Sequence, residues 1–159
     1  MTEIVLPNDT NVYGNLRGGR VLHWMDIAAA VSAQRHSGAW VVTAAVDNVS
    51  FNHPIKLGSV VMIESKVTRA FKTSMEVFIE VWAEDITRKR RFKSNEAFYT
   101  FVAIDDYSHP IQVPHVEPET EAEKKLFEDA QRRRELRLIL AKRMKPEDSK
   151  ELKALFTGR

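Results

Sequence analysis

The sequence predicts an α+β fold in which one long buried helix is followed by about four antiparallel strands. From Arg20 to about His36, apolar residues recur at three- and four-residue spacing, which is the period of a helix. After Gly38 the apolar period changes to two, and the chain becomes rich in Val, Ile, Thr, Phe and Tyr, which favour strands. A sheet of this size must curl around an apolar element. We expect it to wrap the helix, which is the only apolar candidate.

A short strand and a loop precede the predicted helix. Glu3–Leu6 is a brief apolar stretch that ends at Pro7, as is typical of a short strand. Residues 7–15 are dense in Asn, Asp and Gly and should form a loop, which leads to Gly18 and Gly19. The helix is therefore expected to begin beside a glycine-rich loop.

The predicted helix carries a second apolar face. Trp24, Ile27 and Val31 form this face, so the helix is apolar around most of its girth. A helix with this pattern is buried rather than laid on a surface.

Four later segments alternate as strands do, and they are Val41–Asn48, Val60–Thr68, Met75–Glu84 and Glu96–Ile104. The breaks between them contain Gly, Pro or charged residues, and they fall at His53-Pro54, Leu57–Ser59, Phe71–Ser74 and the basic run Arg88–Arg91. The short strand, the helix and these segments make one body, residues 1–113.

Residues 114–159 are expected to form a charged helical tail. Positions 111–159 hold 22 charged residues in 49, whereas residues 1–110 carry 12 basic and 12 acidic residues. Thr120 and Glu123 have capping-box spacing, so a helix should start there and run to about Lys145, until Pro146 breaks it. Lys150–Phe156 can add a turn or two. The apolar stripe of this helix is too thin to stabilise a long helix alone in solution, so we expect the helix to pack on a neighbouring subunit. The alternative is a solvated tail.

Composition excludes several classes of protein. The 159 residues are 43% apolar and 29% charged, which is typical of a globular domain. No apolar run approaches the roughly 18 residues of a membrane span, and no secretory signal opens the chain. The absence of cysteine excludes disulfides and thiolate sites, and the five histidines lack the spacing of metal ligands. Together these features predict a cytoplasmic protein with no membrane partner and no metal. Because the net charge is only +2, we also expect no nucleic-acid partner.

Asp26 is the strongest local anomaly, because it lies in the middle of the helix that we expect to be buried. A buried carboxylate needs a partner, a raised pKa or a wet cleft. The alternative is that Asp26 lies on a narrow exposed stripe with His23 and Ala30. The lack of polar residues along that stripe favours a functional site.

Asn11 is the second candidate. Asparagine in a glycine-rich loop often serves turn geometry alone. However, Gly18 and Gly19 would let the backbone approach a ligand, and the helix N-terminus beside them offers free N–H donors. Such donors stabilise an anion or the oxyanion of acyl transfer. Dinucleotide, phosphate-loop and nucleophile-elbow motifs are absent from the sequence.

The stretch from Pro7 to Asp26 carries a resemblance to a known family. Asp9-Thr10-Asn11, Gly14, Gly18-Gly19 and Met25-Asp26 stand at the spacing found in hotdog-fold acyl-CoA thioesterases of the bacterial short- and medium-chain type and the brain acyl-CoA hydrolase type. Further matches, in order and at family spacing, are Val42-Thr43-Ala44, Asp47 to Phe51, Pro54-Ile55, Gly58, Ser74–Val77 and Phe98 to Phe101. Arg17 and Thr73 depart from the usual pattern. The resemblance runs from about residue 5 to 106, and the tail after about residue 113 falls outside it.

The resemblance implies a hotdog fold, with a long central helix wrapped by a five- to six-stranded antiparallel sheet. Two chains would pair edge to edge into a homodimer, and dimers would associate further into a hexamer, a trimer of dimers. The active site would lie at the dimer interface, where Asn11 of one chain faces Asp26 of the other.

The implied activity is hydrolysis of acyl-CoA to a free fatty acid and CoA without a cofactor, since coenzyme A is part of the substrate. Asp26 would act as general base or as nucleophile, Asn11 would position water or thioester, and the backbone near Gly18 and Gly19 would hold the oxyanion. The residues expected to bind CoA are His53, Pro54, Lys56, Lys72, Thr73, Ser74, Arg90 and Arg91, where basic side chains could pair with phosphates. The run Arg88–Arg91 could equally be a solvated turn.

Two other functions remain open at this point. A non-catalytic acyl-CoA sensor of the same fold is compatible with the charged tail, although a sensor has no need of Asn11 and Asp26. A hydratase or dehydratase of this fold would place a histidine with the acid, and no histidine here has that spacing.

Overall fold

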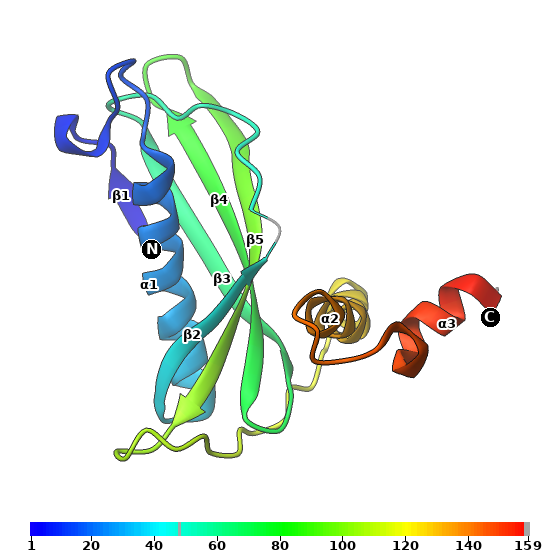
Figure 1. The fold of residues 1–159 in the computed structure, drawn as a ribbon. Coiled ribbons are helices and arrows are strands. Elements are labelled where there is room, and N and C mark those ends of the chain that lie inside the picture. Colours follow the sequence, from blue (N-terminus) through cyan, green and yellow to red (C-terminus); the bar gives the residue numbers. More distant parts are fainter. Residues whose placement is uncertain (48, 158–159) are drawn as a thin grey trace. The chain divides into compact units, whose positions relative to one another are not determined.

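The computed structural model describes residues 1–47 and 49–157. Contacts between residues divide the chain into two units, Met1–His115 and Val116–Arg159 (Figure 1). Asn48, the last residue of one predicted strand, and positions 158–159 of the predicted tail lie outside the described residues.

The described part of the first unit forms one five-stranded antiparallel sheet in the order β1-β3-β4-β5-β2. The strands are β1 (Thr2–Ile4), β2 (Trp40–Asp47), β3 (Val60–Ala70), β4 (Ser74–Asp85) and β5 (Arg90–Ile104). The helix α1 (Gly18–Ser37) lies along one face of this sheet, which curls around it (Figure 1). The prediction of a long helix wrapped by an antiparallel sheet is confirmed, and β1 and β2 are the two edge strands.

The core lies between α1 and one face of the central strands. On β4, alternate residues from Met75 to Ala83 are fully buried, which is the alternation expected from the sequence. On α1, Met25, Ala29 and Ala33 are fully buried in the same cluster. Each large apolar side chain that leaves water in this way contributes roughly 1.5–3 kcal/mol.

The second apolar face of α1 is not buried in the chain, so that part of the prediction is wrong. Trp24 is buried, but Ile27 and Val31 are 42% and 40% exposed. The sheet covers only one side of the helix, so these two side chains point away from it. The helix also begins at Gly18 rather than Arg20, and it ends at Ser37, where Gly38 with a φ of 66° forms a left-handed cap.

The basic run Arg88–Arg91 is only partly a break. The turn ends at Lys89, which has a positive φ of 51°, and β5 begins at Arg90. Asp85 anchors the turn, because its carboxylate accepts hydrogen bonds from the Thr87 hydroxyl and the Arg88 amide, and these bonds lower its pKa. β4 and β5 thus form a hairpin that is longer than the sequence predicts.

The second unit contains α2 (Glu121–Leu140), a 3₁₀ turn (Pro146–Asp148) and α3 (Lys150–Thr157). The predicted capping box is present, with the Glu123 amide donating to the Thr120 hydroxyl at 3.2 Å. However, α2 ends at Leu140, before Lys142 takes a positive φ of 56°, and not at Lys145. No helix in the described ranges is both long and apolar enough to cross a membrane.

A buried carboxylate joins α3 to α2. Glu135 accepts hydrogen bonds from the hydroxyl of Ser149 at 2.6 Å, from the side chain of Gln131 at 2.8 Å and from the Glu151 amide at 3.1 Å. Burial by itself would raise the pKa of Glu135, but the hydrogen bonds outweigh it and hold the pKa below its ordinary value. The ionised carboxylate therefore caps the N-terminus of α3.

Candidate active site

Asp26 lies on the uncovered side of α1, where it is half-buried. The hydroxyl of Thr43, on the edge strand β2, donates a hydrogen bond to Asp26 Oδ1 at 2.8 Å. Thr43 stands at a β-bulge, where the register of β2 against β5 shifts before Ala45. A bulge changes the direction of a side chain, and here it accompanies the link from the sheet edge to the helix.

Tyr99 of β5 lies near this carboxylate. Its ring is buried and its hydroxyl is 3.4 Å from the carbonyl oxygen of Leu22, one helical turn before Asp26. Burial raises the pKa of Tyr99 to about 12, and the negative charge of Asp26 adds to the effect. Tyr99 thus stays protonated at neutral pH beside Asp26.

The exposed stripe proposed as an alternative for Asp26 is present in the chain. His23 is exposed and Ala30 is half-buried, and the exposed Ile27 and Val31 lie beside them. A carboxylate flanked by exposed apolar side chains fits a site that a second surface completes.

Asn11 lies in a tight turn between β1 and α1. Its Oδ1 accepts hydrogen bonds from the amides of Tyr13 at 3.0 Å and Asn15 at 3.2 Å. Gly14 closes the turn with a φ of 70°, which L side chains rarely adopt. Turn geometry is thus one role of Asn11. Because both bonds use Oδ1, the Nδ2 group is left to donate, and it has no partner among the described residues.

The Asn11 groove is a cavity of about 280 Å³ beside this turn. It is lined by Asn11, Asn15, Leu16, Gly18, Val21, Phe51, His53, Pro54, Ile55, Ser94 and Asn95. The ring of Phe51 packs so closely on Gly18 that a Cβ there would lie 3.3 Å from it. Asp26 does not line the groove, so a single chain does not bring Asn11 and Asp26 into one cavity.

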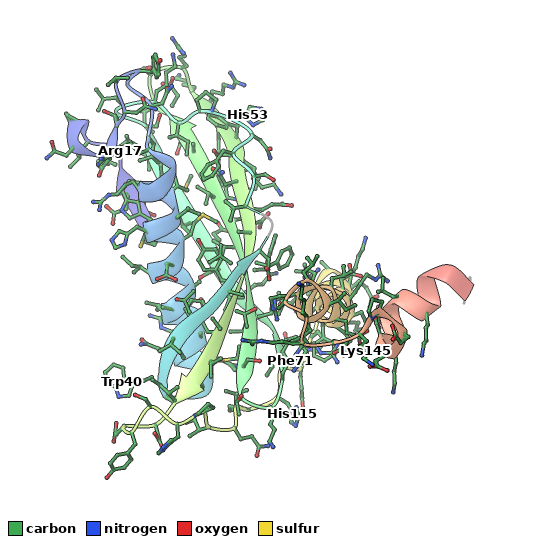
Figure 2. All side chains as sticks on the ribbon, in the orientation of Figure 1. Arg17, Trp40, His53, Phe71, His115 and Lys145 are labelled. Atoms are coloured by element: carbon green, nitrogen blue, oxygen red, sulfur yellow. The ribbon has the colours of Figure 1, made fainter. Side chains whose placement is uncertain are left out.

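The basic groove is a second cavity, of about 170 Å³, and it shares His53 and Pro54 with the first. Its lining is His53, Pro54, Lys56, Ser59, Asp85, Arg88, Arg90 and Phe92. The guanidinium of Arg90 lies 5.4 Å from the centre of the Phe92 ring. Figure 2 shows that His53 and Arg17 lie at one end of the first unit and Trp40 at the other.

Ser94 and Asn95 line the Asn11 groove, and sequence reasoning missed them. Ser94 stands where the register of β5 against β4 shifts, between Lys93 and Asn95. Its hydroxyl donates to the carbonyl oxygen of His53 at 2.9 Å, and the side-chain amide of Asn95 donates to the carbonyl oxygen of Ser50. Both side chains are buried, so the bulge holds the 50–53 segment by two consecutive residues.

Four residues predicted to bind CoA lie away from the basic groove. Lys72 and Thr73 lie in the β3–β4 turn and Ser74 begins β4, so Ser74 is about 37 Å along the strand from Asp85 at about 3.4 Å per residue. Arg91 follows Arg90 on the strand, so it faces the other side of the sheet, where its guanidinium lies 5.1 Å from the Trp82 ring. The structure therefore groups only His53, Pro54, Lys56 and Arg90 of the predicted set.

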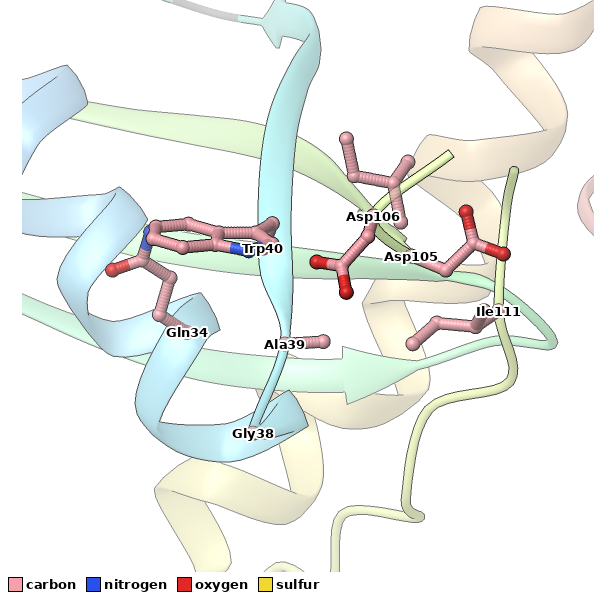
Figure 3. Close-up of a pocket in the computed structure, with 8 residues that line it drawn as sticks. Gln34, Gly38, Ala39, Trp40, Asp105, Asp106 and Ile111 are labelled. Atoms are coloured by element: carbon pink, nitrogen blue, oxygen red, sulfur yellow. The ribbon is translucent and has the colours of Figure 1, made fainter. Parts of the chain in front are cut away.

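Gly19 follows Gly18 in the chain but does not line the Asn11 groove. It faces an open cavity of about 460 Å³ with Arg17, Arg20 and His23, and no atom lies within 4 Å of the place of a Cβ. Another cavity, of about 540 Å³ at the end of α1, is lined by Trp40, Asp105 and Asp106 and holds no predicted site residue (Figure 3). In the part of the chain that the structure describes, no three His, Asp or Glu side chains are grouped as metal ligands.

A long helix wrapped by a sheet in this strand order is a hotdog fold, and comparison with known proteins agrees. The family model "Thioesterase superfamily" matches residues 13–89. Mouse acyl-coenzyme A thioesterase 11 is 42% identical over 145 residues, covering 91% of this chain and 24% of that protein. The uncharacterized acyl-CoA thioester hydrolase YkhA of Bacillus subtilis is 41% identical, covering 83% of this chain and 77% of that protein. A rat cytosolic acyl coenzyme A thioester hydrolase is 34% identical, covering 84% of this chain and 35% of that protein.

Solved structures are similar over most of the chain. A hexameric acyl-CoA thioesterase matches with a TM-score of 0.86 and 41% identity, covering 89% of this chain and 90% of that one. An acyl-CoA hydrolase from Staphylococcus aureus, in complex with butyryl coenzyme A, matches with a TM-score of 0.81 and 36% identity, covering 89% of this chain and 88% of that one. The chain belongs to the thioesterase superfamily and, within it, to the acyl-CoA thioester hydrolases, a family of enzymes.

Two details of the comparisons bear on the predicted residues. Three variants of the Staphylococcus aureus enzyme have been solved, in which alanine replaces an asparagine, an aspartate or a threonine. In that chain the aspartate lies 15 positions after the asparagine, and the threonine lies 17 positions after the aspartate. Asn11, Asp26 and Thr43 have the same spacing. The alignment with the mouse relative covers 145 residues of this chain and so reaches at least residue 145. The expectation that the resemblance ends near residue 113 is wrong.

Proposed function

We propose that the chain hydrolyses acyl-CoA thioesters. A water oxygen bonds to the thioester carbonyl carbon, the carbon–sulfur bond breaks, and the products are a carboxylic acid and the free thiol of CoA. The observation that carries the proposal is the carboxylate of Asp26, held by Thr43 on an uncovered, apolar helix face of a thioesterase fold.

Asp26 is the reacting carboxylate in this proposal. Thr43 occupies Oδ1, and Oδ2 accepts no hydrogen bond within the described residues, so Oδ2 is the atom that faces the substrate. Two routes use it: Oδ2 takes a proton from the attacking water, or it attacks the carbonyl carbon and forms an anhydride that water then opens. Label found on Asp26 after hydrolysis in ¹⁸O-water under single-turnover conditions would establish the anhydride route, since only that route can place it there.

The site belongs to two subunits. Within the described residues the outer edge of β2 has no strand partner, and Val42 and Val46 on this strand are exposed, as are Ile27 and Val31 of α1. A second copy pairing along β2 would cover these side chains and extend the sheet. Asn11 of one subunit then faces Asp26 of the other. The name of the hexameric relative supports a hexamer, which we propose is a trimer of such dimers.

Asn11 and the start of α1 stabilise the oxyanion. Asn11 Oδ1 is held by its own turn, which leaves Nδ2 to donate to the thioester oxygen. Gly18, at the start of α1, lines the Asn11 groove, and its amide has no carbonyl partner inside the helix. One such donor contributes roughly 3–4 kcal/mol to the transition state.

Coenzyme A follows the two connected grooves. Pantetheine lies in the Asn11 groove, and the phosphates lie in the basic groove against Lys56, Arg88 and Arg90. Lys72, Thr73 and Ser74 can contact the same CoA only from another subunit, and Arg91, which packs over Trp82, is left out of the proposed contacts. The reaction uses no cofactor, and the name of the rat relative supports a cytoplasmic location.

Release of free thiol from a panel of short-, medium- and long-chain acyl-CoAs tests the proposal. The wild-type chain is expected to release thiol and Asp26→Ala to lose nearly all turnover. An Asp26→Ala chain that keeps wild-type turnover would contradict the proposed site, and a wild-type chain that binds acyl-CoA without releasing thiol would favour the sensor.

A further inference from the structure

Asp9 is a buried carboxylate two residues before Asn11. Its side chain is 7% exposed, and each oxygen has a different partner. Oδ1 accepts from Arg20 Nε at 2.8 Å, and Oδ2 accepts from the Leu6 amide at 3.0 Å. Burying a carboxylate is costly unless it is paired, so this arrangement fixes Asp9 in place.

Arg20 is itself fixed on α1. It lies one helical turn before Trp24, and its guanidinium is 5.3 Å from the centre of that buried ring. The backbone adds further contacts, because the Arg17 amide donates to the Asp9 carbonyl oxygen at 2.9 Å and the Arg17 side chain donates to the Asn8 carbonyl oxygen. Residues 8 and 9 are therefore attached to the first turn of α1.

Among the described residues, the Asn11 turn makes no side-chain hydrogen bond or ion pair with α1. The amide and side chain of Asn11 bond within the turn, to Asn15 and Tyr13, and the turn is held to the 56–57 segment, where the Leu57 amide donates to the Gly14 carbonyl oxygen at 3.0 Å. We propose that Asp9 is a positioning residue, whose ion pair with Arg20 sets where Asn11 stands relative to α1. This inference rests on the proposed function, because it acts through the amide that Asn11 presents to the thioester.

A double-mutant cycle on the full chain tests the inference, with butyryl-CoA as substrate and kcat, KM and Tm as readouts. Asp9→Asn and Arg20→Met are each made in the wild-type chain and in an Asn11→Ala chain. In the wild-type chain each should lower kcat about tenfold to a hundredfold and leave KM within about twofold, because a displacement of about 1 Å costs this much. In the Asn11→Ala chain the same changes should alter kcat less than about twofold, because the residue they position is gone.

Lys93→Met is the matched control. Lys93 is 41% exposed, as Arg20 is, and pairs with Glu80 at 3.2 Å on the sheet, so it should keep wild-type kcat. Equal losses of kcat with and without Asn11, or no loss with Asn11 present, would overturn the inference while leaving the proposed function intact. A wild-type chain that releases no thiol would instead refute the proposed function. If Asp9→Asn does not fold, Arg20→Met breaks the same contact from the helix side and gives the same comparison.

Discussion

The hydroxyl of Thr43 donates to Oδ1 of Asp26 at 2.8 Å and so connects the edge strand β2 to the outer face of α1. The bond orients the carboxylate, and its second oxygen accepts no hydrogen bond within the described residues. The bond also places the proposed reacting carboxylate at the edge where, in our proposal, a second chain would pair. The two residues are 17 positions apart, and only the fold brings them together.

Thr43→Val should slow the reaction and leave substrate binding intact. The substitution keeps the shape of the side chain and removes the donor to a charged acceptor, an interaction of about 1.5–3 kcal/mol. We expect kcat to fall about tenfold to a hundredfold with KM little changed. Thr43→Ser keeps the hydroxyl and should retain most of kcat, and a Thr43→Val chain with wild-type kcat would show that Asp26 needs no such support.

Asn11→Asp should inactivate the protein without disturbing the turn. An aspartate keeps the oxygen that accepts from Tyr13 and Asn15, but it replaces the donor amide with an acceptor. Losing one oxyanion donor lowers kcat about 10²–10³-fold, and a negative charge there should cost at least as much. The measurements are kcat and Tm. An unchanged Tm with lost kcat is expected, and retained kcat would exclude the donor role.

Arg90→Gln should raise KM for acyl-CoA, and Arg91→Gln should not. Arg90 lines the basic groove, whereas Arg91 packs over Trp82 on the other face of the sheet. The two substitutions are chemically identical at neighbouring positions, so each controls for the other. With an N-acetylcysteamine thioester, which carries no phosphate, Arg90→Gln should behave as wild type. A loss on both substrates would argue against phosphate binding.

Acid should release α3 from α2. The pKa of Glu135 in the folded chain lies below the ordinary value of 4.5, so the ionised group stabilises the contact above that pH. The stabilisation is lost as the pH falls through the lower, folded-state pKa. Limited proteolysis of the C-terminal segment should therefore accelerate between neutral pH and about pH 3.

Glu135→Gln should weaken the α3 contact at neutral pH and remove most of this pH dependence. Glu128, on the same helix, is exposed, so Glu128→Gln is the matched control, and this variant should be cleaved at the wild-type rate. Proteolysis of the wild-type segment at one rate across this pH range would contradict the assigned role.

The elements that the sequence predicts well are those with a clean apolar period. α1 and β4 bury the residues that their periods of 3.6 and two select. The first part of β5 was missed because its charged residues face solvent or stack on Trp82, so no apolar alternation marks it. Ile27 and Val31 show the opposite error, because periodicity reports that a face is apolar and not what covers it.

Some residues of the candidate site are likewise evident from the sequence, and others are not. Asn11 and Asp26 stand out in the sequence as polar residues in unusual settings. Thr43 and Ser94 do not, because Thr and Ser are common in strands and only the bulges give these two side chains their partners. The distance between the β3–β4 turn and the basic groove follows from the length of β4, which the sequence predicts as Met75–Glu84, so the predicted CoA set already spans both ends of one strand.

Mixing two inactive variants tests the two-subunit site most directly. Asn11→Ala and Asp26→Ala chains are unfolded together, refolded and assayed for thiol release from butyryl-CoA. In a symmetric dimer, half the chains form mixed pairs and each mixed pair regains one intact site, so the mixture should reach about a quarter of wild-type kcat. A mixture that stays as inactive as either variant alone would contradict a site built from Asn11 of one subunit and Asp26 of the other.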